Sequence, residues 1–175
     1  MSLDEVDHLF QKASNLKHKC ILMTIYSGGL RRSELINLKI TDIDSQRMLI
    51  KVVAAKGKKD RYTCLSEKLL LHLREYYIKY KPHKWLFEGL NGRPYSATSI
   101  EKIFQSAVRK ANINKYVTPH SLRHSFATHL LEQGINLRYI QELLGHASTK
   151  STELYTRVAS NELRKIRNPL DNMNQ

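Results

Sequence analysis

A single β-rich stretch interrupts a chain whose apolar residues otherwise recur at helical spacing, and this pattern constrains the fold most. Residues 47–54 and 61–65 are rich in β-branched and aromatic side chains, and a short basic segment connects them, as in a β-hairpin. Outside this stretch, apolar residues recur three or four positions apart, which is the spacing of amphipathic helices. The sequence therefore predicts a mainly α-helical domain with one small β-hairpin or sheet, which is an α+β fold.

Capping residues set the limits of several helices. Ser2 and Glu5 have the spacing of a capping box, and Thr118 followed by Pro119 combines a good N-cap with a residue suited to the first helical position. Two glycines, at 28 and 29, can end a helix because glycine readily adopts a positive φ. We expect helices that begin at residues 3 and 119, helices at 17–26, near 34–38 and at 67–80, and one from Ser96 or Ser99 to 111. A further helical segment ends at 144. Residues 85–95 are expected to form an irregular connection.

The length of the chain fits one domain. Its 175 residues, 41% of them hydrophobic, suffice for one well-packed core and are too few for two. The sequence shows no repeat, low-complexity tract or linker. Residues 166–175 are mostly polar and include one proline, so we expect them to form a flexible or partner-docking tail.

The charge of the chain favours a polyanionic partner. Lys and Arg number 29 against 16 Asp and Glu, which gives a formal net charge of +13. Such a surplus is typical of nucleic-acid binding, while acidic lipid or simple solubility are alternatives that charge alone leaves open. The residue motifs have to distinguish between them.

Cys20 and Cys64 stand alone, without a C-x-x-C motif or a nearby His pair at zinc spacing. This pattern indicates neither a disulfide framework nor a structural metal. No stretch approaches the roughly 20 apolar residues of a membrane helix, and the start of the chain lacks an apolar core with a cleavage site. We therefore expect a cytoplasmic protein with no metal, no cofactor and no membrane partner.

His120 and Arg123 lie one helical turn apart, near the start of a predicted helix and away from its apolar stripe. A guanidinium can donate two hydrogen bonds to a phosphate, and an imidazole can donate one or transfer a proton. The pair is therefore a candidate phosphate site, although His-x-x-Arg alone is also common on solvated helix surfaces. His124 and His129 are assigned to such a surface.

Arg31 directly follows the glycine turn and starts a short helix, in which Glu34 lies one turn further on. The carboxylate can brace the guanidinium at this i,i+3 spacing. An ordinary exposed ion pair, which contributes roughly 0.2–0.5 kcal/mol, is the alternative interpretation.

The tip of the predicted hairpin carries four cations within six residues, namely Lys56, Lys58, Lys59 and Arg61. Such a loop can enter a DNA groove, and a lysine on it can donate a proton to a leaving oxygen. Lysines that only keep a β-turn soluble are the alternative. We predict Lys58, Lys59 and Arg61 as DNA-binding residues.

The segment Leu143-Leu144-Gly145-His146 ends one predicted helix, and Tyr155 follows nine residues later within S-T-E-L-Y-T-R. A tyrosine hydroxyl can act as a nucleophile. With nine tyrosines in the chain, most of them expected to pack half-buried, Tyr155 indicates little by itself.

Taken in order, these segments resemble the tyrosine recombinase family, of the phage-integrase and Xer type, over nearly the whole chain. The resemblance identifies six catalytic residues: Arg31 in G-L-R-x-S-E-L, Lys56 in A-K-G-K-K-D-R, His120 and Arg123 in H-x-x-R, His146 in L-L-G-H and Tyr155 in S-T-x-x-Y-T-R. Lys56 is chosen over its neighbours because it precedes the glycine. Family members usually have a separate helical N-terminal domain, so residues 1–175 are expected to be the catalytic domain of a longer protein.

The resemblance also implies the chemistry. Tyr155 would attack the scissile phosphate, form a 3′-phosphotyrosine and release a 5′ hydroxyl, so that rejoining needs no metal, ATP or other cofactor. Arg31 and Arg123 would hold the charge that develops on the phosphate oxygens. The remaining roles are these: His120 accepts the tyrosine proton, His146 donates to a phosphate oxygen, Lys56 protonates the leaving oxygen and Glu34 orients the site.

The implied function is site-specific recombination or integration of double-stranded DNA by a homotetramer on two recombination sites, while the isolated domain could be monomeric. Leu163 and Ile166 would anchor the tail on a neighbouring subunit. A type IB topoisomerase and a DNA-binding module without catalysis are the alternatives. The short length and the L-L-G-H motif favour the recombinase, and the scattered acidic residues disfavour a two-metal nuclease, which needs converging carboxylates.

Overall fold

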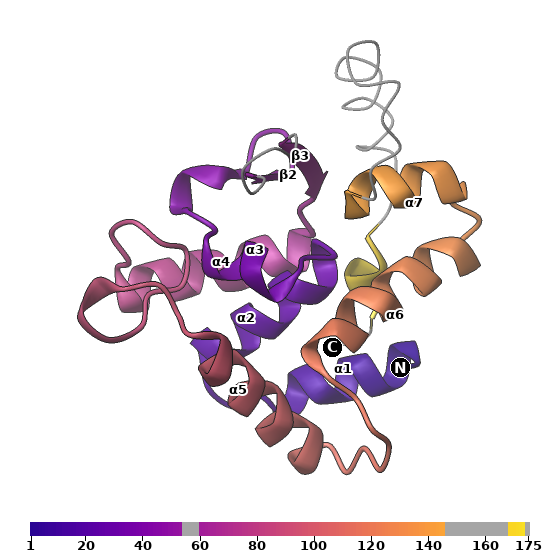
Figure 1. Cartoon of the computed structure of the whole chain (residues 1–175), viewed down its shortest axis with the longest axis horizontal. Helices are drawn as coiled ribbons and strands as arrows, with labels where there is room; N and C mark the ends of the chain where they lie inside the picture. Colours follow the sequence, from indigo (N-terminus) through magenta and orange to yellow (C-terminus); the bar gives the residue numbers. More distant parts are fainter. Residues whose placement is uncertain (54–59, 146–167, 174–175) are drawn as a thin grey trace.

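The computed structural model describes residues 1–53, 60–145 and 168–173. The helices in these ranges are α1 (Leu3–Lys12), α2 (Leu16–Ser27), α3 (Arg32–Ile36), α4 (Glu67–Tyr80), α5 (Ala97–Lys110), α6 (Pro119–Glu132) and α7 (Leu137–Leu144), with short 3-10 helices η1 (Ile40–Asp42), η2 (Leu90–Gly92) and η3 (Pro169–Asn172). The strands are β1 (Ile43–Asp44), β2 (Leu49–Val52) and β3 (Arg61–Cys64). This mainly helical fold with a small sheet confirms the predicted fold class (Figure 1). None of these helices has the length and apolar character required to cross a membrane.

α2 is the central helix of the fold (Figure 1). Its residues from Cys20 to Ser27 are all buried, because α1, α4, α5 and α6 pack around it. A helix in this position needs side chains that tolerate burial around its whole circumference. The Tyr26 ring packs edge-on against Phe10 of α1 and Phe126 of α6, with ring centroids 5.8 and 6.0 Å apart. The end of α2 therefore lies in the interior, next to α6.

The turn that ends α2 requires glycine at one position. Gly29 has a φ of +57°, and a Cβ there would lie 2.8 Å from Phe126 Cδ1 and from Leu144 Cδ2. Any side chain would meet both backbone strain and a collision. The glycine thus allows the turn after α2 to lie close to both α6 and the end of α7.

Several predicted helix limits are confirmed. The hydroxyl of Ser2 accepts from the Glu5 amide and the Glu5 carboxylate accepts from the Ser2 amide, which completes the capping box of α1. α4 spans the predicted residues 67–80, and Ser96 rather than Ser99 is the N-cap of α5. α6 begins at the predicted proline. Side-chain hydrogen bonds therefore mark the starts of α1, α4 and α5, whereas the Thr118 side chain makes no such bond at the start of α6.

The predicted hairpin is present, and a third strand joins it. β2 pairs antiparallel with β3, and Arg61, the first residue of β3, lies opposite Val52. β1 pairs with the other edge of β2 but has only two residues, which is too short for alternation to show in the sequence. The tip of the hairpin, residues 54–59, lies outside the described residues.

Residues 168–173, the described part of the predicted tail, pack against their own chain. Asn168 donates through Nδ2 to the Ser27 carbonyl at 3.0 Å, and Leu170 is buried. The Asp171 carboxylate accepts from Ser66 Oγ at 2.6 Å, at the start of α4. For residues 168–173 these contacts differ from an expected flexible or partner-docking tail, because the partners lie far back in the same chain, where local composition does not reveal them. The rest of the expected tail, 166–167 and 174–175, lies outside the described residues.

His129 is buried, although the sequence placed it on a solvated helix face. Its Nδ1 atom lies 2.8 Å from the Tyr26 hydroxyl, and its Nε2 atom lies 3.1 Å from the Met1 carbonyl oxygen. Both ring nitrogens thus have the partners that a buried imidazole requires. Burial lowers the pKa of His129, so the ring is neutral at neutral pH.

Candidate active site

Arg31 lies at the N-cap of α3, directly after the glycine turn that ends α2. Its backbone amide donates to Glu34 Oε2 at 2.7 Å, and its guanidinium donates to Glu34 Oε1 at 2.9 Å. The Glu34 carboxylate therefore satisfies an unpaired amide of the helix start and holds the Arg31 side chain at the same time. The Arg31 side chain remains 37% exposed, so its guanidinium can reach a ligand outside the protein.

Arg123 lies in α6 and is buried, with a side chain only 3% exposed. Its guanidinium donates to the Gly29 carbonyl, just after α2, and to the Leu144 carbonyl, the last of α7, at 2.6 Å. Carbonyls at helix ends lack partners within their own helix, and they carry the negative end of the helix dipole. Arg123 thus joins the ends of two helices. The sequence predicted only a solvated or phosphate-facing position for this side chain and gave no sign of these contacts.

Glu34 connects these two arginines to a third. Its Oε1 atom accepts from Arg61 Nη1 at 2.7 Å and its Oε2 atom accepts from Arg61 Nη2 at 2.9 Å, which is a bidentate pair. Arg123 Nη1 lies 3.8 Å from Glu34 Oε2. We call these four residues, Arg31, Glu34, Arg61 and Arg123, the arginine cluster.

The charges of the arginine cluster perturb one another. Burial alone would raise the pKa of Glu34, but hydrogen bonds from Arg61 and from the Arg31 amide outweigh it and lower the pKa to about 2. Burial, together with the nearby Arg31, lowers the pKa of Arg123 to about 10, which leaves the guanidinium charged at neutral pH. With three guanidinium groups and one carboxylate, the cluster is suited to bind an anion.

The sequence predicts Arg61 as one of the hairpin cations, whereas the structure places it inside the arginine cluster. Its side chain is 13% exposed, and Nε donates to the Leu143 carbonyl at 2.8 Å. The sequence held no clear signal, because alternation along a strand places Arg61 on the same face as the polar Thr63, whose burial only the structure shows. The role of Arg61 as a DNA-binding residue stays a prediction.

The described structure thus brings together Arg31, Glu34 and Arg123 of the predicted site. His120, at the second position of α6, is exposed three residues before Arg123. The other predicted site residues lie outside the described residues, namely Lys56, Lys58, Lys59, His146 and Tyr155. Two elements that lead towards them, β3 and the end of α7, contact each other.

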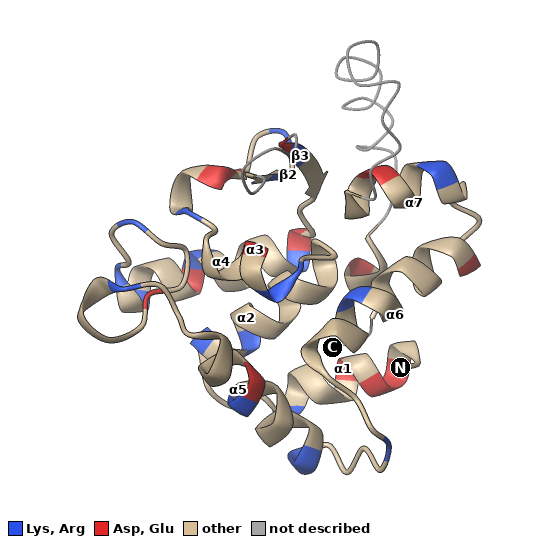
Figure 2. Cartoon of the chain, in the orientation of Figure 1, with Lys and Arg blue, Asp and Glu red and all other residues tan. Residues whose placement is uncertain are grey.

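Outside the arginine cluster, charge is dispersed, since Lys and Arg occur on most helices and loops with acidic residues among them (Figure 2).

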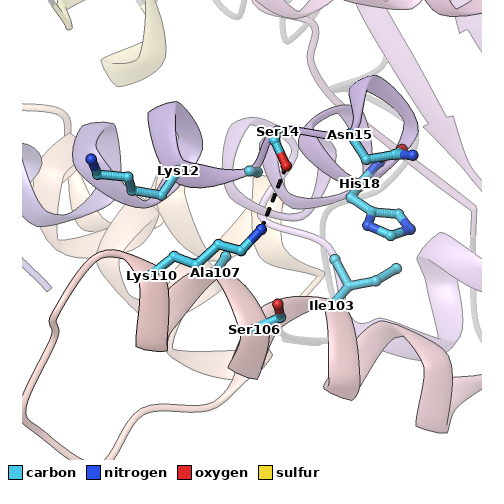
Figure 3. Close-up of a pocket in the computed structure, with 9 residues that line it drawn as sticks. Lys12, Ser14, Asn15, His18, Ile103, Ser106, Ala107 and Lys110 are labelled. Atoms are coloured by element: carbon cyan, nitrogen blue, oxygen red, sulfur yellow. Dashed lines mark hydrogen bonds between the residues drawn. The ribbon is translucent and has the colours of Figure 1, made fainter.

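A small hollow lies between α5 and the turn from α1 to α2, and Lys12, His18 and Lys110 line it (Figure 3). Lys110 donates there to Ser14 Oγ at 3.5 Å. The hollow has a volume of about 30 Å³, which suits little more than a water molecule, and it lies at the start of α2, whereas the arginine cluster lies at its end. Within residues 1–53, 60–145 and 168–173, no three His, Cys, Asp or Glu side chains converge as metal ligands would.

Comparison with known proteins identifies the family of the chain. Residues 1–162 match the family described as the phage integrase family. Protein y4qK of Sinorhizobium fredii, whose name describes an integrase/recombinase, is 46% identical over 98% of this chain and 56% of its own length. Tyrosine recombinase XerA of Pyrococcus horikoshii is 40% identical over 93% of this chain and 58% of its own length. The chain thus spans less than two thirds of the length of these relatives.

Solved structures agree with the sequence matches. The crystal structure of a XerA recombinase aligns with a TM-score of 0.80 at 33% identity, over 93% of this chain and 64% of that chain. The XerH site-specific recombinase bound to its difH substrate has the same fold, with a TM-score of 0.76 at 23% identity over 91% of this chain and 53% of that chain. The chain therefore belongs to the phage integrase family of tyrosine recombinases, as its motifs predict.

Proposed function

We propose that this chain is the catalytic domain of an enzyme that carries out site-specific recombination or integration of DNA. The observation that carries the proposal is the arginine cluster, which holds Arg31 and Arg123 around one carboxylate although their motifs are far apart in the sequence. Two fixed guanidinium groups are suited to the nonbridging oxygens of a phosphodiester. Membership of the family supports four further catalytic residues at the motif positions: Lys56, His120, His146 and Tyr155.

In the proposed reaction, the Tyr155 oxygen attacks the scissile phosphorus, and the bond from phosphorus to the 5′ oxygen breaks. His120 accepts the tyrosine proton, and Lys56 gives a proton to the leaving 5′ oxygen. Arg31 and Arg123 stabilise the charge that gathers on the nonbridging oxygens. The 3′-phosphotyrosine retains the phosphodiester energy, so the 5′ hydroxyl of another strand can reverse the step without ATP.

Double-stranded DNA is the proposed substrate, and a homotetramer on two recombination sites is the proposed working assembly. The net charge of +13 supports a polyanionic partner, and XerH, which has the same fold, was solved bound to its difH substrate. Lys58 and Lys59 are proposed to contact this DNA from the hairpin tip. The cytoplasm is the proposed location.

Formation of a covalent protein–DNA adduct tests the proposal. The substrate is a pool of nicked duplexes with randomised sequence around the nick, so that the short strand with the 5′ hydroxyl diffuses away and the adduct is trapped. The chain is fused to a DNA-binding module whose known site flanks the random region, since tethering raises the local concentration and compensates for weak binding. We expect an adduct that resists SDS, and sequencing of its DNA identifies the target.

Tyr155→Phe is the matched control, because it removes only the nucleophilic oxygen. Loss of the adduct in this variant assigns the nucleophile. If the tethered wild-type chain forms no adduct while the untethered chain still binds duplex DNA, the proposal is overturned in favour of a DNA-binding module. Adducts accompanied by plasmid relaxation, without strand exchange between two sites, would instead indicate a topoisomerase.

A further inference from the structure

Arg61 directs its guanidinium into the protein. Its two terminal nitrogens donate to the two Glu34 oxygens at 2.7 and 2.9 Å, and Nε donates to the Leu143 carbonyl at 2.8 Å. A Cβ built on Gly145 would lie 2.8 Å from Arg61 Cδ, so the aliphatic stem also packs against the turn that ends α7. All three guanidinium nitrogens are thus engaged within the fold.

The contacts of Arg61 control the orientation of Glu34. A planar guanidinium that binds both oxygens of a carboxylate fixes its plane as well as its distance. The same Oε1 atom accepts from Arg31 at 2.9 Å, and Oε2 accepts from the Arg31 amide at 2.7 Å. A rotated Glu34 carboxylate would therefore displace the Arg31 guanidinium.

Arg61 also reaches the second phosphate-binding arginine, by way of α7. It holds the Leu143 carbonyl, while Arg123 holds the adjacent Leu144 carbonyl at 2.6 Å. The last two residues of α7 are thus fixed by two arginines that both lie beside Glu34. A shift in the end of α7 would change the hydrogen bonds of Arg123.

On the basis of the proposed function, we propose that Arg61 is a positioning residue that sets the geometry of Arg31 and Arg123 through Glu34 and the end of α7, instead of contacting DNA. Its bidentate pair with Glu34 and the bond from Nε to the Leu143 carbonyl use all three guanidinium nitrogens for contacts within the fold. Displacement of catalytic groups by about 1 Å can slow a reaction by about 100-fold. Arg61 therefore affects the rate of strand cleavage more than the affinity for DNA.

Three variants separate positioning from DNA contact: Arg61→Gln, Arg61→Lys and the control Arg74→Gln, which removes an exposed charge on α4. Cleavage is measured in single turnover with the tethered chain at saturation, and binding of the untethered chain to duplex DNA is measured across salt concentrations. We expect Arg61→Gln to cleave about 100-fold more slowly. Its salt dependence should match that of Arg74→Gln, whereas loss of a phosphate contact would reduce the slope by about 0.9. Such a reduced slope, confined to Arg61→Gln, would overturn the proposal.

The conservative variant tests geometry against charge. Arg61→Lys keeps the positive charge but cannot form the bidentate pair, so it should cleave nearly as slowly as Arg61→Gln. A lysine that restores the wild-type rate would show that only charge is needed at this position. Urea unfolding checks that each variant is folded, and Arg61→Lys carries the test if Arg61→Gln does not fold.

A double-mutant cycle with Glu34→Gln tests the route of the effect. If Arg61 acts through Glu34, the double variant should cleave little more slowly than either single variant, whereas independent roles would give additive losses of rate.

The same cycle is measured in the free energy of unfolding. The Glu34 carboxyl is also titrated by NMR, and its pKa should rise in Arg61→Gln. These two readouts need no DNA, so they test the link between Arg61 and Glu34 even if the wild type forms no adduct. Additive effects and an unchanged Glu34 pKa would contradict the proposal.

Discussion

Replacement of Glu34 by glutamine should destabilise the fold strongly at neutral pH and much less in acid. The variant keeps the size of the side chain but removes the one negative charge of the arginine cluster, which leaves Arg61 and the buried Arg123 without their anionic partner. The pKa of Glu34 is about 2 in the folded chain against 4.5 ordinarily, and this difference corresponds to about 3 kcal/mol of stability. Loss of one partner of a buried ion pair typically costs a similar amount, about 3–5 kcal/mol.

The pH dependence follows from the direction of the shift. Because folding lowers the pKa of Glu34, its contribution is fully present above pH 4.5 and is lost as the pH falls towards 2. Urea unfolding of the wild type and of Glu34→Gln, measured from pH 7 downwards, should therefore give a gap of about 3 kcal/mol that closes below pH 4.5. Glu75→Gln, an exposed change on α4, is the matched control and should stay within about 0.5 kcal/mol of the wild type. A gap under about 1 kcal/mol at pH 7, or one that does not close in acid, would refute this reasoning.

Three further substitutions test other contacts. Gly29→Ala, with its Cβ 2.8 Å from side chains of α6 and α7, should lower the free energy of unfolding in urea by about 2–4 kcal/mol. The control Gly134→Ala, which has a positive φ but open space around the Cβ, should lower it by only about 1 kcal/mol. Equal losses in the two variants would exclude a collision at Gly29. Tyr26→Phe should lower stability by about 1–2 kcal/mol in thermal unfolding, since it leaves the buried Nδ1 of His129 without a partner, and an unchanged melting temperature would contradict that hydrogen bond. Asp171→Ala should cost about 1 kcal/mol and speed hydrogen exchange in the first turn of α4, whereas unchanged exchange there would argue against its capping role.

The helices were predictable because their signals are local. The limits of α4 follow from the apolar spacing within residues 67–80. The starts of α1 and α6 follow from the capping box at Ser2 and from Pro119 at the first helical position. The hairpin was predictable for the same reason, since its two strands adjoin in sequence. β1 was missed, because two residues gain their strand conformation only by pairing with β2.

The environment of the site was less predictable, because its contacts join distant segments. A charged side chain away from the apolar stripe of a helix is normally solvated, yet Arg123 is buried because carbonyls from the ends of α2 and α7 lie around it. His129 is buried for a similar reason, since its partner Tyr26 comes from α2. The motifs identified Arg31 and Glu34 as a pair, but only the fold adds Arg61 to it.

The composition of the arginine cluster has a consequence for selectivity between reaction states. Three guanidinium groups and one carboxylate carry a net charge of +2. A phosphodiester has one negative charge, but after attack by a tyrosine oxygen that has lost its proton, the five-coordinate phosphorus centre has two. In the proposed reaction the cluster therefore matches the charge of the transition state rather than that of bound DNA, which is the condition for faster reaction instead of merely tighter binding. Without the carboxylate the same arginines would attract intact DNA more strongly, so Glu34 also limits how firmly the site holds unreacted substrate.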